Sequence, residues 1–215
     1  MTLPTHVASL ATPVAISGAV VLALAHRDAD TVTTDSLVGA LDPIEFAAVE
    51  RFRHVADARA AMLRRLLARA AARVVSPETD LAIRTGPCAR CGGPHGRPSI
   101  VGAELSVSMS GTATMSAVAV SSTPIGIDIE ATLSPETSRA LADLLTSRSG
   151  GPEASAELWT ALEARAKLIG AGVADVIRSN LAADALVHSF TLRDGIIGSV
   201  ASFAPEGSAA RIVDI

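Results

Sequence analysis

The sequence predicts an α+β protein made of two halves with similar elements. In each half, strand-like segments accompany a long segment of helical periodicity, and a passage rich in glycine and proline, residues 84–102, separates the halves. We therefore divide the chain into an N-terminal half, residues 1–102, and a C-terminal half, residues 103–215. A chain of 215 residues can bury a core either as one large domain or as two small ones.

In the N-terminal half, an apolar run over residues 14–25 predicts one buried strand, and residues 43–75 predict one long helix. The helix carries an apolar stripe near the helical period, formed by Phe46, Val49, Phe52, Val55, Ala56, Met62, Leu63, Leu66 and Leu67. Arginines fill the opposite side, and we interpret them as a solvated basic face, made of Arg64, Arg65, Arg69 and Arg73.

The C-terminal half begins with three strand-like segments, over residues 104–109, 115–121 and 125–130. Two helices are expected after them, near residues 135–147 and 153–171. The chain closes with two alternating apolar and polar runs, and the Asp-Gly dipeptide at 194 and 195 between them is typical of a hairpin turn. These runs cover residues 186–195 and 196–203, and residues 210–215 are a candidate last strand.

The composition argues against several classes of function. The net charge of −4 and the isoelectric point near 5.7 give no basic footprint for nucleic acid. No apolar run approaches the roughly 20 residues of a membrane span, and the longest, residues 13–25, lacks a basic leader and a cleavage signature. The only cysteines, Cys88 and Cys91, favour a reducing cytoplasm over a disulfide framework. We expect a cytoplasmic protein that binds neither nucleic acid nor membranes.

Residues 125–130, IGIDIE, place two acids inside an apolar run. Side chains alternate faces along a strand, so Asp128 and Glu130 share one face while the isoleucines share the other. Two carboxylates this close repel each other unless a cation lies between them. The pair therefore has two interpretations: the solvated polar face of an ordinary strand, or a divalent metal site that still needs a third ligand.

A third carboxylate occurs in the last long helical segment, ELWTALEARAKLIGAG, residues 157–172. Trp159, Glu163 and Lys167 are spaced i, i+4 and i+8, so they lie along one side of the helix. Taken alone, the glutamate and lysine would be a weak exposed ion pair and the tryptophan a core residue. Together with the D-x-E strand that precedes it, the helix forms a specific combination.

This combination resembles the 4'-phosphopantetheinyl transferases, in particular the larger, surfactin-synthetase-activating type. GIDIE (126–130) is similar to the family's G-[VI]-D-[VI]-E, and WTALEARAK (159–167) is similar to its W-[TSC]-x-K-E-A-x-x-K. Upstream, CARCGGPHGRP (88–98) resembles C-x-x-C-G-x-P-H-G-[KR]-P, and VSMSGTATMSAVAVSS (107–122) resembles the V-S-H-S-G strand, turn and strand. The four segments occur in the family's order.

The resemblance implies a fold of two pseudo-two-fold-related halves, each an antiparallel sheet packed against a long helix. It also implies an activity: transfer of the phosphopantetheine arm of coenzyme A to a serine of an apo acyl or peptidyl carrier protein, with release of adenosine 3',5'-bisphosphate. Carrier proteins of polyketide or nonribosomal peptide synthases are the expected partners. Members of this type act as monomers.

By the same resemblance, Asp128, Glu130 and Glu163 would bind Mg²⁺, with Mn²⁺ left open as the metal. Asp128, Glu163 and Lys167 would be the catalytic residues. Glu163 would accept the proton of the carrier serine, directly or through water, and Lys167 would offset phosphate charge. The residues matched to coenzyme A contacts are Gly96, Arg97 and Pro98 at the adenine end, and Ser108, Ser110 and Gly111 at the nucleotide phosphates.

The cysteines have two interpretations. Cys88, Cys91 and His95 suggest a zinc site, but a structural zinc site needs four ligands and three are at hand. The alternative is a tight loop of glycine and proline in which the cysteines are small apolar fillers. His95 has no catalytic role that we can assign.

Several positions depart from the family pattern. Met109 stands where members carry histidine and cannot donate a hydrogen bond to a phosphate, and Leu162 stands where they carry lysine. Each lost charge-assisted contact would cost about 1.5–3 kcal/mol of binding. The basic residues that usually face the 3'-phosphate fall near Glu45, Ala48 and Ala60, and the available substitutes are Arg51, Arg53 and Arg59.

Three functional hypotheses follow. The first is a working transferase with a rearranged phosphate pocket. The second is an enzyme on the same scaffold with another substrate, such as dephospho-coenzyme A, or another chemistry. The third is a non-catalytic module that binds a carrier protein or another partner. The retained carboxylates and Lys167 favour the two enzymes, since a module that only binds needs no metal ligands.

Overall fold

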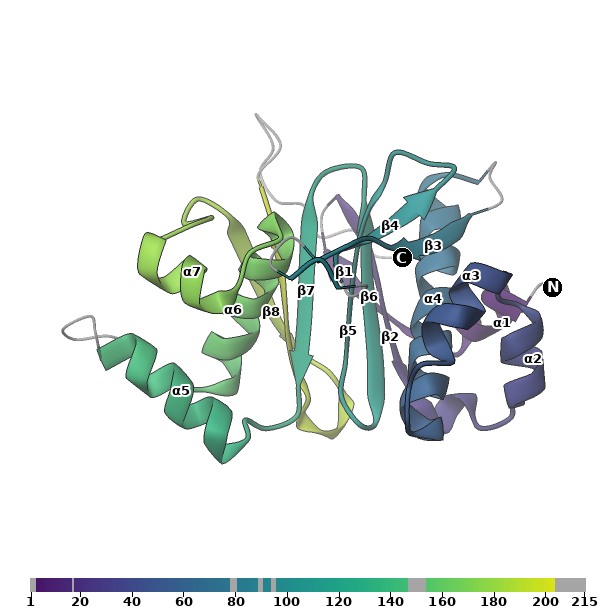
Figure 1. The fold of residues 1–215 in the computed structure, drawn as a ribbon, viewed down its shortest axis with the longest axis horizontal. Coiled ribbons are helices and arrows are strands. Elements are labelled where there is room, and N and C mark those ends of the chain that lie inside the picture. Colours follow the sequence, from purple (N-terminus) through teal and green to yellow (C-terminus); the bar gives the residue numbers. More distant parts are fainter. Residues whose placement is uncertain are drawn as a thin grey trace.

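The computed structural model describes residues 3–16, 18–77, 81–88, 91–93, 96–146 and 154–203. Within them the fold is α+β, as the sequence predicts: two antiparallel sheets, each with a long helix packed on it (Figure 1). The pseudo-two-fold relation between the halves stays a prediction. The candidate strand at 210–215 lies outside the described residues, as does His95.

The larger sheet has six strands in the order β1-β2-β6-β5-β4-β3, and the smaller has three in the order β7-β9-β8. The strands of the larger sheet are β1 (Thr12–Ile16), β2 (Ala19–Ala25), β3 (Ala82–Thr85), β4 (Pro98–Val101), β5 (Ser106–Gly111) and β6 (Met115–Ser121). Those of the smaller sheet are β7 (Ile125–Glu130), β8 (Leu186–Thr191) and β9 (Ile197–Ser202). The helices are α1 (Leu3–Ser9), α2 (Thr34–Gly39), α3 (Pro43–Val49), α4 (Val55–Val75), α5 (Pro135–Thr146), α6 (Ala156–Ile169) and α7 (Val173–Ser179), with 3-10 turns η1 (His26–Ala29) and η2 (Arg193–Gly195).

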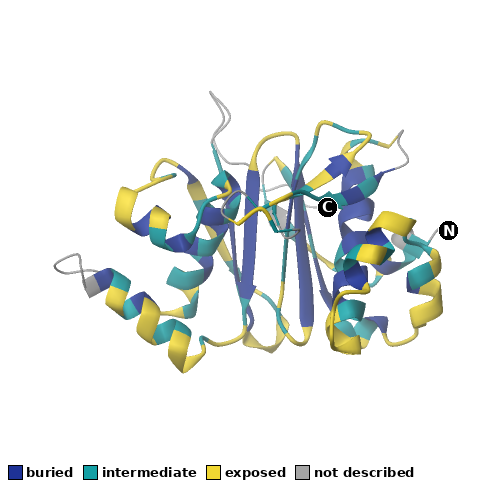
Figure 2. Cartoon of the chain, in the orientation of Figure 1, coloured by how far each residue is buried: buried dark blue, intermediate teal, exposed yellow. Residues whose placement is uncertain are grey.

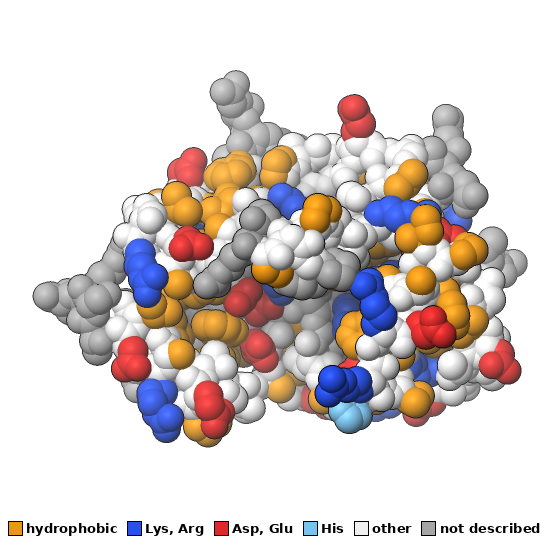
Figure 3. All heavy atoms as spheres, in the orientation of Figure 1, with side chains coloured by type: hydrophobic (Ala, Val, Ile, Leu, Met, Phe, Trp, Pro, Cys, Tyr) orange, Lys and Arg blue, Asp and Glu red, His pale blue; other side chains and the backbone are white. Residues whose placement is uncertain are grey.

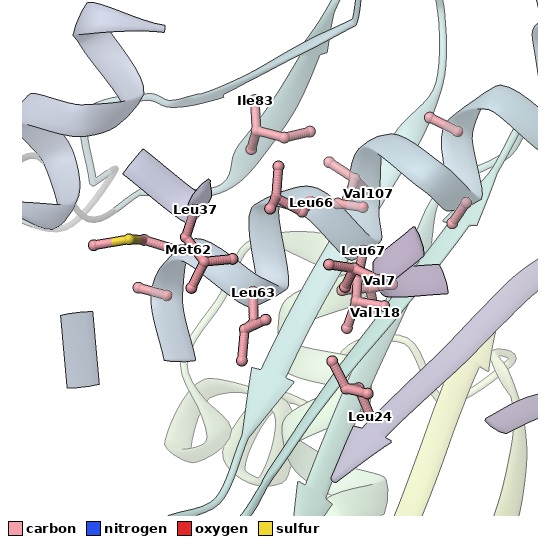
Figure 4. Close-up of a cluster of buried hydrophobic side chains, with 14 of the residues drawn as sticks. Val7, Leu24, Leu37, Met62, Leu63, Leu66, Leu67, Ile83, Val107 and Val118 are labelled. Atoms are coloured by element: carbon pink, nitrogen blue, oxygen red, sulfur yellow. The ribbon is translucent and has the colours of Figure 1, made fainter. Parts of the chain in front are cut away.

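Four layers follow one another across the molecule: α4, the larger sheet, the smaller sheet and α6 (Figure 1). The central strand β6 is buried along its whole length, because alternate residues contact cores on opposite sides. Val118, labelled in Figure 4, and Val120 pack towards α4, whereas Ala117 and Ala119 pack towards β7. Figure 2 shows the resulting buried centre.

Two elements that were predicted as continuous in the N-terminal half are interrupted in the structure. The single strand expected over 14–25 is a hairpin, β1 and β2, and Gly18 in its turn has a φ of +73° that favours glycine. The single helix expected over 43–75 is two helices separated by residues 50–54. A capping box fixes the start of α3, in which the Asp42 and Glu45 side chains each accept a hydrogen bond from the other residue's backbone N–H.

The solvated basic face expected on α4 is also wrong for two of its arginines. Arg65 is 7% exposed and Arg69 is 8% exposed, because α1, α2 and α3 cover the side of α4 that faces away from the sheet. Arg69 is neutralised inside the protein, where it pairs with the buried Glu45 carboxylate and donates to the Ala40 carbonyl at 2.6 Å. The Arg69 guanidinium is therefore bound by groups of the protein and not by solvent.

Apart from the candidate strand at 210–215, which is not tested, the elements expected in the C-terminal half are confirmed. β5, β6 and β7 lie over the three predicted strands, α5 and α6 over the two predicted helices, and β8 pairs with β9 around the predicted turn. The chain passes from the larger sheet to the smaller one between β6 and β7. β5 and β6 therefore belong to the larger sheet, although they follow residue 102, where the sequence divides the two predicted halves. No helix in the described part of the chain is long and apolar enough to cross a membrane.

A row of serine hydroxyls joins the two sheets. The side chains of alternate residues of β5 point towards β7 and accept hydrogen bonds from its backbone N–H groups on the side that does not pair with β9. The pairs are Ile125 to Ser106 at 3.2 Å, Ile127 to Ser108 at 3.0 Å and Ile129 to Ser110 at 3.3 Å. We call these three contacts the serine ladder. They set the position of β7 relative to the larger sheet.

The alternation expected along β7 is confirmed, but its polar face is not solvated. The isoleucines lie in the core between the sheets, and the other face lies against α6. Gly126 allows this close approach, since a Cβ at that position would lie 2.0 Å from the Ala164 carbonyl oxygen and 2.6 Å from the Leu168 nitrogen.

Substitution of Gly126 by alanine tests this contact. Both atoms that the new methyl group would meet belong to the backbone of α6, so the helix must shift as a whole. We expect Gly126→Ala to lower the free energy of unfolding by about 3 kcal/mol, as measured by urea denaturation followed by circular dichroism. Gly39→Ala is the control, because no atom lies within 4 Å of its added Cβ. Equal losses in both variants would contradict the close-approach argument.

Candidate active site

Helix α6 presents three polar or aromatic side chains to the polar face of β7. Ser155 caps the start of the helix, where its hydroxyl accepts a hydrogen bond from the N–H of Leu158 at 3.2 Å, and Gly170 caps its end in the left-handed conformation that favours glycine. Because the helix lies so close to β7, its i, i+4, i+8 row meets the D-x-E pair. The structure therefore brings together the two segments that the sequence analysis paired.

Asp128 is the centre of this arrangement. It is 4% exposed, and its Oδ1 accepts hydrogen bonds from Lys167 Nζ at 2.6 Å and from the Ser110 hydroxyl at 2.7 Å. Lys167 Nζ also lies 3.3 Å from Ser110 Oγ. Three elements, β5, β7 and α6, thus supply one side chain each to a single polar cluster. The ammonium compensates the buried carboxylate, which would otherwise be costly.

The second carboxylate oxygen of Asp128 has no donor. Asp128 Oδ2 is buried and accepts no hydrogen bond from any part of the chain that the structure describes. Buried carboxylate oxygens are normally satisfied, so this oxygen is available to a water molecule, an ion or a bound ligand. A cation, or a donor on a substrate, would remove the cost of its burial.

The other two carboxylates respond to the same charges. Burial raises the pKa of the Glu163 carboxyl above its ordinary value of 4.5; Lys167 partly opposes the rise, and Asp128 adds to it. Burial, followed by the charge of Asp128, likewise raises the pKa of Glu130. Lys167 and a hydrogen bond from the Trp159 side chain act in the opposite direction on Glu130. Three carboxylates therefore influence one another around one ammonium.

This donor set fits a hard cation that would take its remaining ligands from water or from a bound molecule. Among the described residues, no three histidine, cysteine, aspartate or glutamate side chains form a ready-made metal cage. Mg²⁺ commonly takes one or two carboxylates and fills its other positions with phosphate oxygens and water. The unsatisfied Asp128 Oδ2 and the raised pKa values of Glu130 and Glu163 match that mode of binding, since a cation would relieve both.

The segment matched to the adenine end of coenzyme A lies beside this cluster. The Arg97 guanidinium donates to the Leu168 carbonyl at 3.0 Å, the Ile125 carbonyl at 3.2 Å and the Ser106 hydroxyl at 2.9 Å. It therefore ties the loop to α6, β7 and β5. Gly96 is required by a close backbone approach, because a Cβ there would lie 2.2 Å from the Pro87 carbonyl oxygen. Pro98 begins β4.

The remaining candidate residues lie in different surroundings. Ser108 is 4% exposed and its hydroxyl belongs to the serine ladder. Gly111, at the end of β5, leaves room for the guanidinium of Arg64. Arg53 is exposed in the connection between α3 and α4. Cys88 and Cys91 lie in the loop before β4, where Cys88 N–H donates to Gly93 O at 2.7 Å.

The departures from the family pattern have structural explanations. Met109 packs against the core beneath α4, on the side of β5 away from Asp128. Leu162 is 7% exposed in the core between α5, α6 and α7. Glu45 is 1% exposed and binds Arg69 and the Ile83 N–H. Met109 and Leu162 therefore serve packing, and Glu45 serves an internal ion pair.

Neither the serine ladder nor the need for glycine at position 126 is among the features predicted from the sequence. The signal was present in both cases. Serine stands at every second position of SVSMSG (106–111), which places the three hydroxyls on one face of a strand. Gly126 is the one position on the polar face of β7 without a side chain, which is a mark of close approach by another backbone.

No protein-family model matches this chain, and no characterised protein matches its sequence. The likeness to the phosphopantetheinyl transferases therefore stays a prediction that rests on the four sequence segments.

The raised pKa of Glu163 predicts a stability that depends on pH. Between the ordinary value of 4.5 and the raised native value, the folded state binds more protons than the unfolded state, so the free energy of unfolding falls as the pH rises. Glu163→Gln removes this loss. We expect the variant to be more stable than the natural chain near neutral pH, with the difference vanishing below the ordinary pKa.

Denaturant unfolding across a pH series measures the effect. Glu157→Gln is the matched control, since Glu157 is exposed on the first turn of the same helix. It should keep the natural pH profile. A Glu163→Gln variant that is destabilised equally at every pH would contradict the argument.

Proposed function

We propose that this chain transfers the 4'-phosphopantetheine arm of coenzyme A to a serine hydroxyl of an apo acyl or peptidyl carrier protein, with Mg²⁺ as the metal. The observation that carries the proposal is the state of Asp128. One of its oxygens is held by Lys167 and Ser110, and the other is buried without a donor, next to two further carboxylates. The carrier of a polyketide or nonribosomal peptide synthase is the proposed partner, and the chain would act as a monomer in the cytoplasm.

Asp128, Glu130 and Glu163 are the residues that would hold Mg²⁺. When bound, the metal would offset the negative charge on the pyrophosphate oxygens of coenzyme A. Ser110 and Lys167 fix Asp128 Oδ1, so that only Oδ2 is available to a ligand. The Lys167 side chain is 31% exposed, and its ammonium would attract the phosphate groups of the substrate.

Glu163 is the proposed general base. The oxygen of the carrier serine forms a bond to the phosphorus that bears the pantetheine arm, and the bond from that phosphorus to the bridging oxygen breaks. Adenosine 3',5'-bisphosphate leaves with the electron pair, and the serine proton passes to Glu163.

A second candidate is the same transfer from dephospho-coenzyme A, which lacks the 3'-phosphate. It is favoured by Glu45, which is buried in an ion pair with Arg69, and by Met109, which packs against the core beneath α4. The family places phosphate-binding residues at or near these positions.

Calorimetric titration with coenzyme A and with dephospho-coenzyme A, each with and without Mg²⁺, separates the two candidates. Metal-dependent binding that prefers coenzyme A supports the first. Equal, metal-dependent affinity for both supports the second. If neither compound binds, the transferase proposal is wrong.

The role of Glu163 has its own test. We expect Glu163→Gln to slow transfer to an apo carrier protein about a hundredfold or more, because no carboxylate then accepts the serine proton. Mass spectrometry of the carrier, which gains one phosphopantetheine group, measures the rate. Glu157→Gln should transfer at the natural rate. Unchanged turnover in Glu163→Gln would exclude Glu163 as the base.

A further inference from the structure

The loop between β3 and β4 carries both thiols of the chain, Cys88 and Cys91. Cys88 is half-buried, Cys91 is exposed, and no disulfide joins them in this structure. The loop crosses in front of β7 and β5 in Figure 1, on the face of the molecule that Figure 3 shows. A dissolved reagent can therefore reach Cys91 directly.

Backbone hydrogen bonds hold the two cysteines within one turn. The Gly92 N–H donates to the Cys88 carbonyl at 2.8 Å, and the Cys88 N–H donates to the Gly93 carbonyl at 2.7 Å. A bond from residue i+4 to residue i closes a turn of helical dimensions, in which Cα atoms i and i+3 lie about 5 Å apart and their side chains share one side. Disulfides join cysteines whose Cα atoms are roughly 4.4–6.8 Å apart. The turn therefore has the dimensions that a disulfide between Cys88 and Cys91 requires.

The rest of the loop keeps this turn in place. Gly92 has a φ of +69°, in the left-handed region that favours glycine, so it ends the turn directly after Cys91. At the base of the loop, the Gly96 N–H donates to the Gly86 carbonyl at 2.9 Å, and Arg97 bonds to β5, β7 and α6. A disulfide would close a turn that the reduced chain already forms.

Metal binding is the other chemistry that two cysteines at this spacing offer. A structural zinc site needs four ligands. Among the described residues, no third histidine, cysteine, aspartate or glutamate joins the two cysteines in a group that could hold a metal. Oxidation needs only the two sulfur atoms, so the described geometry favours a disulfide.

We propose that Cys88 and Cys91 are a site of reversible oxidation by low-molecular-weight disulfides. The exposed Cys91 thiolate attacks one sulfur of the reagent, whose S–S bond breaks, and the other sulfur leaves as a thiolate. The Cys88 thiolate then attacks Cys91 Sγ in this mixed disulfide. The S–S bond of the protein forms as the second sulfur of the reagent leaves. The cysteines lose two protons and two electrons, and the reagent becomes two thiols.

The modification would act on a loop that Arg97 anchors to three elements. A disulfide limits local opening of that loop, so it links the redox state of the surroundings to how firmly the loop is held. The inference concerns the two thiols and no bound ligand. It therefore stands whether or not the chain transfers phosphopantetheine.

Intact mass spectrometry, after alkylation of the remaining thiols, tests the site. The reduced chain is equilibrated with glutathione disulfide and glutathione at a series of ratios, with a metal chelator present. We expect both thiols to be lost together, with no glutathione retained and no dimer formed, and dithiothreitol should restore both. A chain that retains glutathione, that forms disulfide-linked dimers, or that keeps both thiols at every ratio would overturn the proposal.

Two serine variants separate the two steps. In Cys88→Ser the mixed disulfide has no second thiol to resolve it, so Cys91 should retain one glutathione. That adduct should need a ratio of glutathione disulfide to glutathione about tenfold or more above the one that oxidises the natural chain, because ring closure in the natural chain is intramolecular. Cys91→Ser leaves only the half-buried thiol, which should react several-fold more slowly. If the natural chain and Cys88→Ser react at the same ratio, the two thiols do not act as a pair.

Thermal unfolding shows whether the turn is preformed. The oxidised natural chain should melt a few degrees above the reduced chain, because a disulfide that fits the folded turn restricts the unfolded chain. Cys88→Ser, which cannot form the disulfide, is the control and should melt at the same temperature under both conditions. An unchanged or lower melting temperature of the oxidised natural chain would show that the turn must distort, against the geometry inferred for it.

Discussion

The serine ladder between β5 and β7 is the contact on which the rest of the molecule depends. The two sheets do not share a backbone ladder, so the N–H groups on the outer side of β7 would be buried without partners. Three serine hydroxyls at every second position of β5 accept them. The spacing of these hydroxyls fixes both the distance and the register of β7. The same register lets the Ser110 hydroxyl donate a hydrogen bond to Asp128 Oδ1. The contact that joins the sheets therefore also helps to build the polar cluster.

A second constraint acts from the other side. The absence of a side chain at Gly126 lets the backbone of α6 lie against β7, and this closeness places Lys167 within 2.6 Å of Asp128. It also buries Glu163, which is the largest cause of its raised pKa. The electrostatics of the cluster thus follow from backbone packing. Moving α6 outward would expose Glu163 and would at the same time separate Lys167 from Asp128.

The sequence was sufficient to predict the strands and helices of the C-terminal half within the described residues, and the side chains that meet at Asp128. Period-two alternation identified β7 and its two faces, and the i, i+4, i+8 spacing identified the side of α6 that meets it. The arginines of α4 were misplaced because helical periodicity distinguishes two sides of a helix but not what covers them. Three helices, α1, α2 and α3, cover the side that was expected to face solvent. The break between α3 and α4 was missed because the apolar stripe continues across it. The capping box at Asp42 marks where α3 begins and gives no sign of where it ends.

The serine ladder also has a consequence for self-association. β7 is the outermost strand of its sheet, and a strand in that position offers unpaired N–H and C=O groups to strands of other molecules. Proteins usually protect such edges with charges, prolines or bulges. Here the N–H row is occupied by hydroxyl groups from the same chain, so the edge is closed to intruding strands without a covering strand or an added charge. A molecule cut between β6 and β7 would lose this protection, and its two fragments would be prone to aggregate.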